Sequence, residues 1–283
     1  MRTLEGQVVA VLGGSSGMGR ETARHLATLG ATVVIGARRV DLCEELVDSI
    51  RRDEGDAAAI GVDATDPESV RQFFEVLQAN YGRLDAAFNN VGRTLGHSPT
   101  IDTPLERFEQ TLDFNLKSTF LCMQQELRLM SAAGRGSIVN NSSIGGTRGF
   151  AGLQDYCAAK WGVIGLTKAA ALESAAQGIR INVIAPGLVA TERFELIRSQ
   201  QSALLDALLQ RRGEVLSRAL ILEKVWGLSH DPTTNVVDVY IRYLRQKLDV
   251  EGQPSVIETL RGRGYRLRAE GEGEREGERE GEA

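Results

Sequence analysis

The stretch "VVAVLGGSSGMGRETARHLATLGATVVIGARR", residues 8–39, decides the fold of the first part of the chain. It begins and ends with short, continuous apolar runs, which are typical of strands buried on both faces. Between them, a turn with Gly13, Gly17 and Gly19 leads directly into a helical pattern. This order predicts the first strand–helix–strand unit of a parallel sheet.

Strands and helices continue to alternate as far as about residue 184. The predicted strands are 8–12, 32–36, 58–62, 85–89, 137–141 and 180–184, and the predicted helices are 18–29, 41–53, 67–81, 104–132 and 155–177. Residue types at the helix ends fit, with Gly30 at a C-terminus and Asp41 and Asp66 at N-caps. The predicted fold class is therefore α/β, with a doubly wound, Rossmann-type parallel sheet.

The glycine turn is suited to a pyrophosphate, because glycine lets the backbone approach the phosphates and the helix N-terminus supplies amide donors. An ordinary tight turn is the alternative, but the position directly after the first strand favours the nucleotide site. The second strand ends at Arg38 and Arg39, where an NAD site usually carries a carboxylate. Two guanidinium groups suit the 2′-phosphate of NADP, so we expect NADP rather than NAD, unless both arginines are simply solvated.

Tyr156 and Lys160 are four residues apart in "YCAAK" and therefore lie on one face of a helix. A phenol has a pKa of about 10, and a nearby cation lowers it towards neutral pH. Tyr156 could then exchange a proton with a substrate oxygen while a hydride moves to or from a nicotinamide. Such a spacing also arises by chance, so the pair needs support from its neighbours.

That support comes from a series of motifs in a fixed order. They are the glycine turn, Asp63, "NNVG" (89–92), Asn115, "NNSS" (140–143), "YCAAK" (156–160) and "PGLVAT" (186–191). With them, residues 1 to about 191 resemble the short-chain dehydrogenase/reductase family. The resemblance implies an oxidoreductase that transfers a hydride between NADP(H) and an alcohol or carbonyl substrate. It implies a catalytic set in which Ser143 binds the substrate oxygen and Asn115 anchors a water that relays protons to Lys160, beside Tyr156.

The resemblance also implies a cofactor site and a homodimer. The implied cofactor-binding residues are Gly13, Ser15, Ser16, Gly17, Met18, Gly19, Arg38, Arg39, Asp63, Asn89, Gly92, Tyr156, Lys160, Pro186, Gly187 and Thr191. Among them, Asp63 would contact the adenine and Asn89 would line the cofactor side. Structural roles are the alternatives, such as a helix kink at Asn115 or a turn at Asn89. The dimer would form through the helices at 104–132 and 155–177.

After Thr191 the pattern of this family stops, so the sheet is expected to be truncated at its C-terminal edge. Helices are predicted at about 199–211, 217–226 and 233–248, followed by two short strands around "RGRG" (261–264). The motifs "RRGEVLSR", "KVWG", "NVVDVYIRYLRQKL" and "IETLRGRGYRL" make about 194–268 resemble the winged-helix output domain of OmpR-type response regulators. The N-terminal sheet of that domain is missing, and "RFELI" (193–197) is the one candidate for a remnant of it.

This second resemblance implies a DNA-reading third helix and a wing that touches the phosphates or the minor groove. The implied DNA-binding residues are Asn235, Arg242, Arg245, Arg261 and Arg263. Basic residues outnumber acidic ones over 211–268, which suits contact with phosphates. A helical domain with solvated arginines is the alternative.

Composition limits the remaining classes. The chain has 283 residues, 42% of them hydrophobic and 25% charged, as in an ordinary globular protein, and its net charge of −5 gives no general attraction to nucleic acid or anionic lipid. No signal peptide or membrane-spanning stretch is present in the sequence, so we expect a cytoplasmic protein with no membrane partner. The three cysteines, Cys43, Cys122 and Cys157, have no metal-ligand spacing, and we expect buried thiols and no metal site.

Three domains or segments are therefore expected: an NADP-binding, short-chain dehydrogenase/reductase-like domain at 1–191, a winged-helix DNA-binding-like domain at 194–268, and a disordered acidic tail at 269–283. The main hypothesis for function is the oxidoreductase. The alternatives are a DNA-binding transcriptional regulator and an inactive fusion of two truncated domains, since each resemblance lacks a part of its family's pattern.

Overall fold

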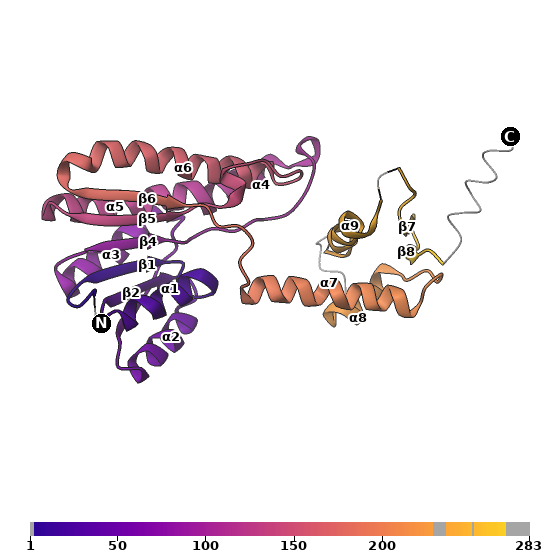
Figure 1. The fold of residues 1–283 in the computed structure, drawn as a ribbon, viewed down its shortest axis with the longest axis horizontal. Coiled ribbons are helices and arrows are strands. Elements are labelled where there is room, and N and C mark those ends of the chain that lie inside the picture. The colour runs from indigo at the N-terminus through magenta and orange to yellow at the C-terminus, as the bar shows by residue number, and fades with distance from the viewer. Residues whose placement is uncertain (1–2, 229–235, 251, 270–283) are drawn as a thin grey trace. The chain divides into compact units, whose positions relative to one another are not determined.

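The computed structural model describes residues 3–228, 236–250 and 252–269 (Figure 1). Contacts between residues divide the chain into two compact units, Met1–Thr191 and Glu192–Ala283, which we call the first unit and the second unit. Apart from Ala269, the predicted acidic tail lies outside the described residues.

The first unit is built on a six-stranded parallel sheet with the strand order β3-β2-β1-β4-β5-β6 (Figure 1). The strands are β1 (Val8–Leu12), β2 (Thr32–Ala37), β3 (Asp56–Gly61), β4 (Ala86–Asn89), β5 (Gly136–Asn141) and β6 (Ile179–Ile184). The order reverses between β1 and β4, and such a switch point is where open α/β sheets bind ligands, beyond the carboxyl ends of the strands. The predicted doubly wound α/β fold is confirmed, and β6 lies at an edge of the sheet.

Helices cover both faces of this sheet. The α-helices of the first unit are α1 (Gly17–Thr28), α2 (Val40–Arg52), α3 (Pro67–Tyr81), α4 (Leu105–Leu112), α5 (Ser118–Ala133) and α6 (Gln154–Ser174), and its 3-10 turns are η1 (Thr100–Asp102), η3 (Ile144–Gly146) and η4 (Ala175–Gln177). Val9 and Val11 pack in one core with α1 and α2, whereas Ala10 and Leu12 pack in the other with α3 and α5. This alternation explains why β1 is apolar throughout.

Most predicted helix ends are confirmed. Asp66 caps α3, because its side chain accepts a hydrogen bond from the Glu68 amide at 3.1 Å. Gly30 has a φ of 93°, which only glycine adopts readily. The prediction that Asp41 is an N-cap was wrong, because α2 begins at Val40 and Asp41 lies in its first turn. A carboxylate there still interacts favourably with the helix dipole.

The helix predicted at 104–132 is interrupted. Between α4 and α5 the chain forms a π-helical turn, η2 (Asp113–Lys117), with Asn115 at its centre. The Asn115 side-chain amide donates to the Thr111 and Arg93 carbonyl groups, both at 2.8 Å. Such turns occur frequently at functional sites, because they reorient one side chain within a helix.

Over its described residues, the second unit contains three helices and a hairpin, as predicted for a winged helix. They are α7 (Glu192–Gln210), α8 (Arg218–Trp226), α9 (Val236–Leu248), β7 (Ile257–Leu260) and β8 (Gly264–Leu267). They enclose a core of their own that includes Leu208, Ile241 and Tyr265, and Ser217 caps α8 by accepting from the Leu220 amide at 3.2 Å. The suggestion that 193–197 is a remnant of a sheet was wrong, because this segment belongs to α7. A helix pairs its own backbone groups, whereas a lone strand cannot.

Within the described ranges, no helix is both long and apolar enough to cross a bilayer. The three cysteines are free and buried, as predicted.

Candidate active site and nucleic-acid interface

The glycine turn lies between β1 and α1 and contains the predicted residues Gly13, Ser15, Ser16, Gly17, Met18 and Gly19. Gly13 and Gly17 have φ angles of 79° and 55°, and a Cβ atom on Gly19 would lie 2.3 Å from the Gly13 carbonyl oxygen. Ser16 is the N-cap residue of α1, but its side chain makes no capping hydrogen bond. The turn is thus a tight backbone cradle at a helix N-terminus, and such a cradle suits a pyrophosphate.

The two arginines after β2 lie close to this turn. The Arg39 guanidinium donates to Ser15 Oγ at 2.9 Å and to Ser16 Oγ at 2.8 Å. The Arg38 guanidinium lies 3.9 Å from Asp63 Oδ2. Burial raises the pKa of Asp63, but hydrogen bonds from Thr65 and the two nearby cations, Arg38 and Arg93, outweigh it and leave that pKa lowered. Cationic donors and serine hydroxyl groups therefore gather at the ends of β1, β2 and β3.

The ends of β1, β4 and β5 are in register, with Leu12 opposite Asn89 and Asn89 opposite Asn140. The Asn89 side chain is buried, and donates to Glu126 Oε2 at 3.0 Å and to Asn140 Oδ1 at 2.9 Å. The Asn89 side chain therefore points towards α5, and its place on the cofactor side stays a prediction.

Asn90, the residue directly after β4, faces the glycine turn instead. Asn90 Nδ2 donates to the Gly13 carbonyl at 3.1 Å, and Asn90 Oδ1 accepts from Asn141 Nδ2 at 2.7 Å. Sequence analysis overlooked Asn90, although the alternation in β4 carried the signal: Ala87 packs in the same core as Leu12, and Phe88 in the other.

Lys160 is buried, with 3% of its surface exposed, and its ammonium group donates to the Asn141 carbonyl at 2.9 Å. Burial lowers the pKa of Lys160 to about 8. The Nζ atom lies 5.8 Å from the centre of the Tyr156 ring. A Cβ atom on Gly92 would lie 3.0 Å from this Nζ and 2.5 Å from Asn115 Oδ1, so all three residues meet at one point.

Ser143 and Tyr156 are half-buried and face the same short turn. Ser143 Oγ caps η3 by accepting from the Gly145 amide at 3.1 Å. A Cβ atom on Gly145 would lie 3.4 Å from two carbons of the Tyr156 ring. The structure thus brings together four predicted residues from η2, the end of β5 and α6.

The segment Pro186–Thr191, which includes Gly187, runs from η3 to the glycine turn. The Ile144 amide donates to the Pro186 carbonyl at 2.8 Å, and a Cβ atom on Gly17 would lie 3.5 Å from Thr191 Cγ2. This segment therefore contacts both η3, which lies against Tyr156, and the glycine turn.

Two buried acidic residues near the site escaped sequence analysis. Asp155 is 1% exposed and accepts hydrogen bonds from Arg107 Nε at 3.1 Å, Thr111 Oγ1 at 3.0 Å and the Tyr156 amide at 2.9 Å. Glu126 is fully buried, and burial raises its pKa to about 8 against the opposing hydrogen bond from Asn89. In the sequence, Asp155 is only the residue before Tyr156, and Glu126 is one polar residue in an apolar helix. Neither position indicates the hydrogen-bond partners that the structure shows.

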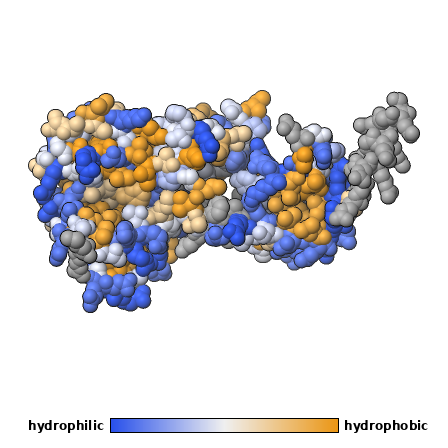
Figure 2. Space-filling model, viewed as in Figure 1, coloured by the Kyte–Doolittle hydropathy of each residue, from blue (hydrophilic) through white to orange (hydrophobic). Residues whose placement is uncertain are grey.

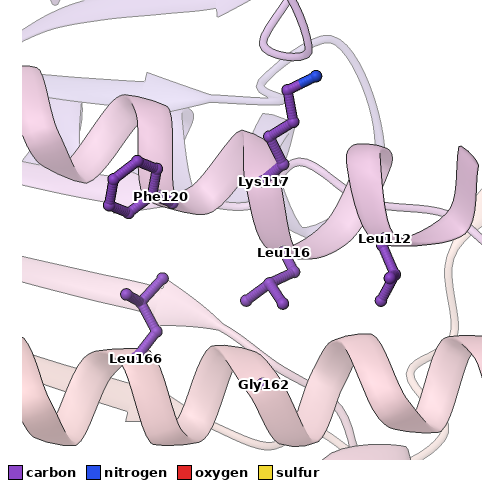
Figure 3. A pocket seen from close by; sticks show the side chains of 6 residues that line it. All are labelled: Leu112, Leu116, Lys117, Phe120, Gly162 and Leu166. Carbon is purple, nitrogen blue, oxygen red and sulfur yellow. The ribbon is translucent and has the colours of Figure 1, made fainter. Parts of the chain in front are cut away.

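A separate apolar cavity of about 400 Å³ lies between α6 and the segment formed by α4, η2 and α5. It is lined by Leu112, Leu116, Lys117, Phe120, Gly162 and Leu166 (Figure 3). Figure 3 shows the leucines directed into the space between the helices, whereas Lys117 points away from it. On α6, Trp161 is 52% exposed and Leu172 is 84% exposed, and hydrophobic surface is visible where α6 runs (Figure 2).

In the second unit, the predicted DNA-binding arginines differ in their surroundings. Arg261 and Arg263 are exposed on both sides of Gly262 at the tip of the hairpin, and Arg242 is half-buried on α9. The Arg245 guanidinium donates to the Ile257 carbonyl at 3.0 Å and to Thr259 Oγ1 at 2.8 Å, so it joins α9 to β7. Asn235 lies outside the described residues. Over the described ranges, no three His, Cys, Asp or Glu residues are grouped as a metal site would require.

A nucleotide cradle at the switch point of a doubly wound sheet, beside a buried lysine and a tyrosine, defines a dinucleotide-dependent class of protein. Residues 7–202 match the family described as "short chain dehydrogenase". The chain belongs to the short-chain dehydrogenase family, whose members use nicotinamide cofactors.

Named relatives agree with this assignment. The chain is 39% identical over 185 residues to cyclohexanol dehydrogenase of Acinetobacter sp. (strain SE19), covering 65% of this chain and 74% of that protein. It is 41% identical over 188 residues to cis-4-hydroxycyclohexanecarboxylate dehydrogenase of Sinomonas cyclohexanicum, covering 65% and 74%. The crystal structure of levodione reductase matches with a TM-score of 0.67 and 32% identity, covering 72% of this chain and 78% of that one.

Residues 194–267 match a second family, described as "Transcriptional regulatory protein, C terminal". The two matches overlap at 194–202, within α7. The chain therefore joins an oxidoreductase-family segment to a winged-helix segment.

Proposed function

We propose that the first unit binds NADP(H) and transfers a hydride between this cofactor and an alcohol or carbonyl substrate. The observation that carries the proposal is the meeting of buried Lys160 with Asn115 at Gly92, one helical turn from Tyr156. The cradle at Gly13 and Gly19 fits a dinucleotide, because it has no room for a Cβ atom.

Bound nicotinamide would supply or accept the hydride. In the direction of reduction, Tyr156 donates its phenolic proton to the substrate oxygen, and Ser143 Oγ donates a hydrogen bond to the same oxygen. The Lys160 ammonium stabilises the phenolate that remains. Since the pKa of Lys160 is about 8, its ammonium form predominates below that pH. Oxidation uses the same groups in reverse.

For the cofactor, we propose NADP rather than NAD. Arg39, held by Ser15 and Ser16, and the half-exposed Arg38 offer several donors to a 2′-phosphate. Titration with NADPH and NADH, followed by nicotinamide fluorescence, tests this. Arg38→Ala and Arg39→Ala should weaken NADPH binding about 10-fold or more and leave NADH binding nearly unchanged. Equal affinity of the unaltered protein for both cofactors would contradict it.

For the substrate, we propose secondary alcohols on six-membered rings and the corresponding ketones. Two relatives carry the names of cyclohexanol and hydroxycyclohexanecarboxylate dehydrogenases. Exposed apolar side chains lie on the segments that flank the site, with Phe150 at 37%, Leu188 at 88% and Ile101 at 91%. Reduction rates for cyclohexanone and for linear ketones of the same size test the proposal, with Tyr156→Phe as the inactive control. Faster turnover of the linear ketones would overturn it.

For the assembly, we propose a homodimer in which a second copy covers α5 and α6. The apolar cavity between α6 and the α4–η2–α5 segment, together with the exposed Trp161 and Leu172, supports this face. Trp161→Glu should convert the protein to monomers in analytical ultracentrifugation, whereas Val76→Glu, on exposed surface of α3, should not. A monomeric unaltered protein at micromolar concentration would refute the proposal.

The second unit is the basis of a second candidate function, binding to DNA. The observation that favours it is the exposed pair Arg261 and Arg263 at the hairpin tip, and the half-buried Arg242 on α9 adds a third cation to this unit. A mobility-shift assay at low salt tests it, with Arg198→Ala as a control for loss of one exposed charge. Equal binding by the control and by an Arg261→Ala, Arg263→Ala double variant would eliminate this role.

We further propose that 1–191 and 194–268 act as two domains, with the cytoplasm as their location. The competing possibility is an inactive fusion of truncated domains, and a thermal melt with and without NADPH separates the two. A cooperative transition that NADPH raises is expected from a functional site. A transition unaffected by saturating NADPH would favour the inactive fusion.

A further inference from the structure

A buried ion pair connects α4 with the residue that precedes Tyr156. Arg107 Nε donates to Asp155 Oδ2 at 3.1 Å, with side chains 16% and 1% exposed. The second hydrogen bond to this oxygen comes from Thr111 Oγ1, and Asp155 Oδ1 accepts the Tyr156 amide. The carboxylate of Asp155 is thus removed from water and directly joined to the backbone of Tyr156.

Arg107 is itself held in place from the other side. Its Nη2 atom donates to Thr103 Oγ1 at 3.1 Å, and Gly96 packs against it, because a Cβ atom there would lie 3.4 Å from Nη1. Thr103 in turn accepts a hydrogen bond from Gln154 at the start of α6. The guanidinium is therefore fixed between two elements, which makes its charge a permanent feature of this end of α6.

The pair also belongs to a chain of hydrogen bonds between two residues of the proposed catalytic set, Asn115 and Tyr156. Thr111, which donates to Asp155, offers its carbonyl to the Asn115 side-chain amide at 2.8 Å. A single chain of hydrogen bonds thus runs from Asn115 in the π turn, through Thr111 and Asp155, to the Tyr156 amide.

Charge matters here as much as geometry. Asp155 is the neighbour of Tyr156 in the chain and accepts its backbone amide, and a buried carboxylate at such a position disfavours the phenolate, because two negative charges repel in a medium that screens poorly. Proton exchange by Tyr156 requires the phenolate to be accessible. Without a paired cation, the negative charge of Asp155 would therefore raise the pKa of the Tyr156 phenol, against the effect of Lys160. A cation paired with Asp155 cancels this increase.

We propose that Arg107 is a positioning residue for the reaction: by neutralising and orienting Asp155, it holds the first turn of α6 and keeps the Tyr156 phenol able to ionise near neutral pH. This inference rests on the catalytic role proposed for Tyr156. No role in contacting cofactor or substrate is assigned to Arg107 or Asp155.

Other charged groups on the elements packed against this end of α6 have their own surroundings. On α4, Glu106 and Glu109 are exposed to solvent, where their charges are screened. In the π turn, Asp113 and Lys117 form a half-exposed ion pair at 3.3 Å. The η3 turn against the Tyr156 ring consists of isoleucine and two glycines. Among the described residues, we therefore take Lys160 and the Arg107–Asp155 pair as the buried charges that bear on the phenol.

Titration of the phenol tests the proposal without any need for turnover. Absorbance at 295 nm is followed against pH, and subtraction of the same titration with Tyr156→Phe isolates Tyr156. Arg107→Met should move the Tyr156 midpoint up by about one pH unit, since it leaves Asp155 uncompensated. Arg107→Lys, which keeps the charge, should leave it within a few tenths of a unit. Arg107→Met combined with Asp155→Asn should return it towards the original value.

A second variant protects the test against a failure of Arg107→Met to fold. Asp155→Asn alone leaves the positive charge of Arg107 without its buried carboxylate and should lower the Tyr156 midpoint. An unchanged midpoint in Arg107→Met, or in Asp155→Asn where Arg107→Met does not fold, would overturn the proposal, as would a shift that persists in the double variant. The proposed function fails separately, if the unaltered protein does not oxidise NADPH with any ketone while the midpoints shift as described.

Discussion

Lys160 in the first unit and Arg261 in the second are both cations at proposed functional sites, yet Lys160 is 3% exposed and Arg261 lies in open solvent. Lys160 is buried against the end of β5, where the Asn141 carbonyl accepts its ammonium group. Arg261 stands at the tip of a hairpin, next to Gly262 with a φ of 74°. Proton transfer needs an environment that shifts a pKa, whereas contact with phosphates needs charge that a large polyanion can reach. The same charge thus serves different chemistry according to its burial.

The largest expected effect that tests this contrast comes from the buried cation. Lys160→Met should lower kcat for ketone reduction by about 10²- to 10⁴-fold, because the Tyr156 phenolate loses its neighbouring positive charge. Lys168→Met, an exposed lysine on the same helix, is the matched control and should retain full activity. Similar losses in both variants would show that helix α6 was disturbed in general.

Glu126 gives a second test, based on pH and stability. Its pKa is about 8 in the folded protein against 4.5 for the ordinary side chain. Since the unfolded chain releases this proton first, the free energy of unfolding should fall as pH rises through this interval, by at most about 1.4 kcal/mol per pH unit. The contribution is fully present below pH 4.5 and lost above about 8.

Glu126→Gln removes the titrating group and keeps an oxygen that can accept from Asn89. Urea unfolding of the first unit between pH 5 and 8 should therefore show a smaller slope against pH in this variant. Identical slopes in the variant and the unaltered protein would mean that Glu126 is ionised in the fold.

Most of the fold and part of the candidate site could be predicted from the sequence. The apolar runs located every strand of the sheet, because burial on both faces leaves a continuous signal. The π turn at Asn115 was anticipated only as an alternative, a helix kink, since a change of hydrogen-bond pattern leaves the apolar period of a helix almost intact. The Arg107–Asp155 pair was missed because its partners are far apart in sequence and meet only after α4 packs on α6. The contact of Asn90 with the glycine turn was not predicted, because its partners Gly13 and Asn141 are far from it in sequence.

A smaller effect is expected from the exposed cations. If the hairpin of the second unit contacts phosphates, an Arg261→Ala, Arg263→Ala double variant should lower the slope of log affinity against log salt by about 2. Fluorescence anisotropy with a labelled duplex at several salt concentrations measures it. An unchanged slope would remove the hairpin from the interface.

The smallest expected effect compares one helix cap in each unit. Asp66→Ala and Ser217→Ala each remove a side-chain acceptor from a helix N-terminus and should cost about 0.5–2 kcal/mol. If the two units are separate domains, each substitution should lower a different unfolding transition in calorimetry. A single transition lowered by both would indicate that the units unfold together.

The measurement that tests the central claim most directly follows the hydride itself. NADPH deuterated at the reactive carbon of its nicotinamide is incubated with the protein and a panel of cyclic and linear ketones, and the products are analysed by mass spectrometry. The account predicts deuterium on the carbinol carbon of a cyclic alcohol with the unaltered protein and with Lys168→Met, and none with Tyr156→Phe. Absence of labelled alcohol from every ketone, or equal labelling with Tyr156→Phe, would contradict it.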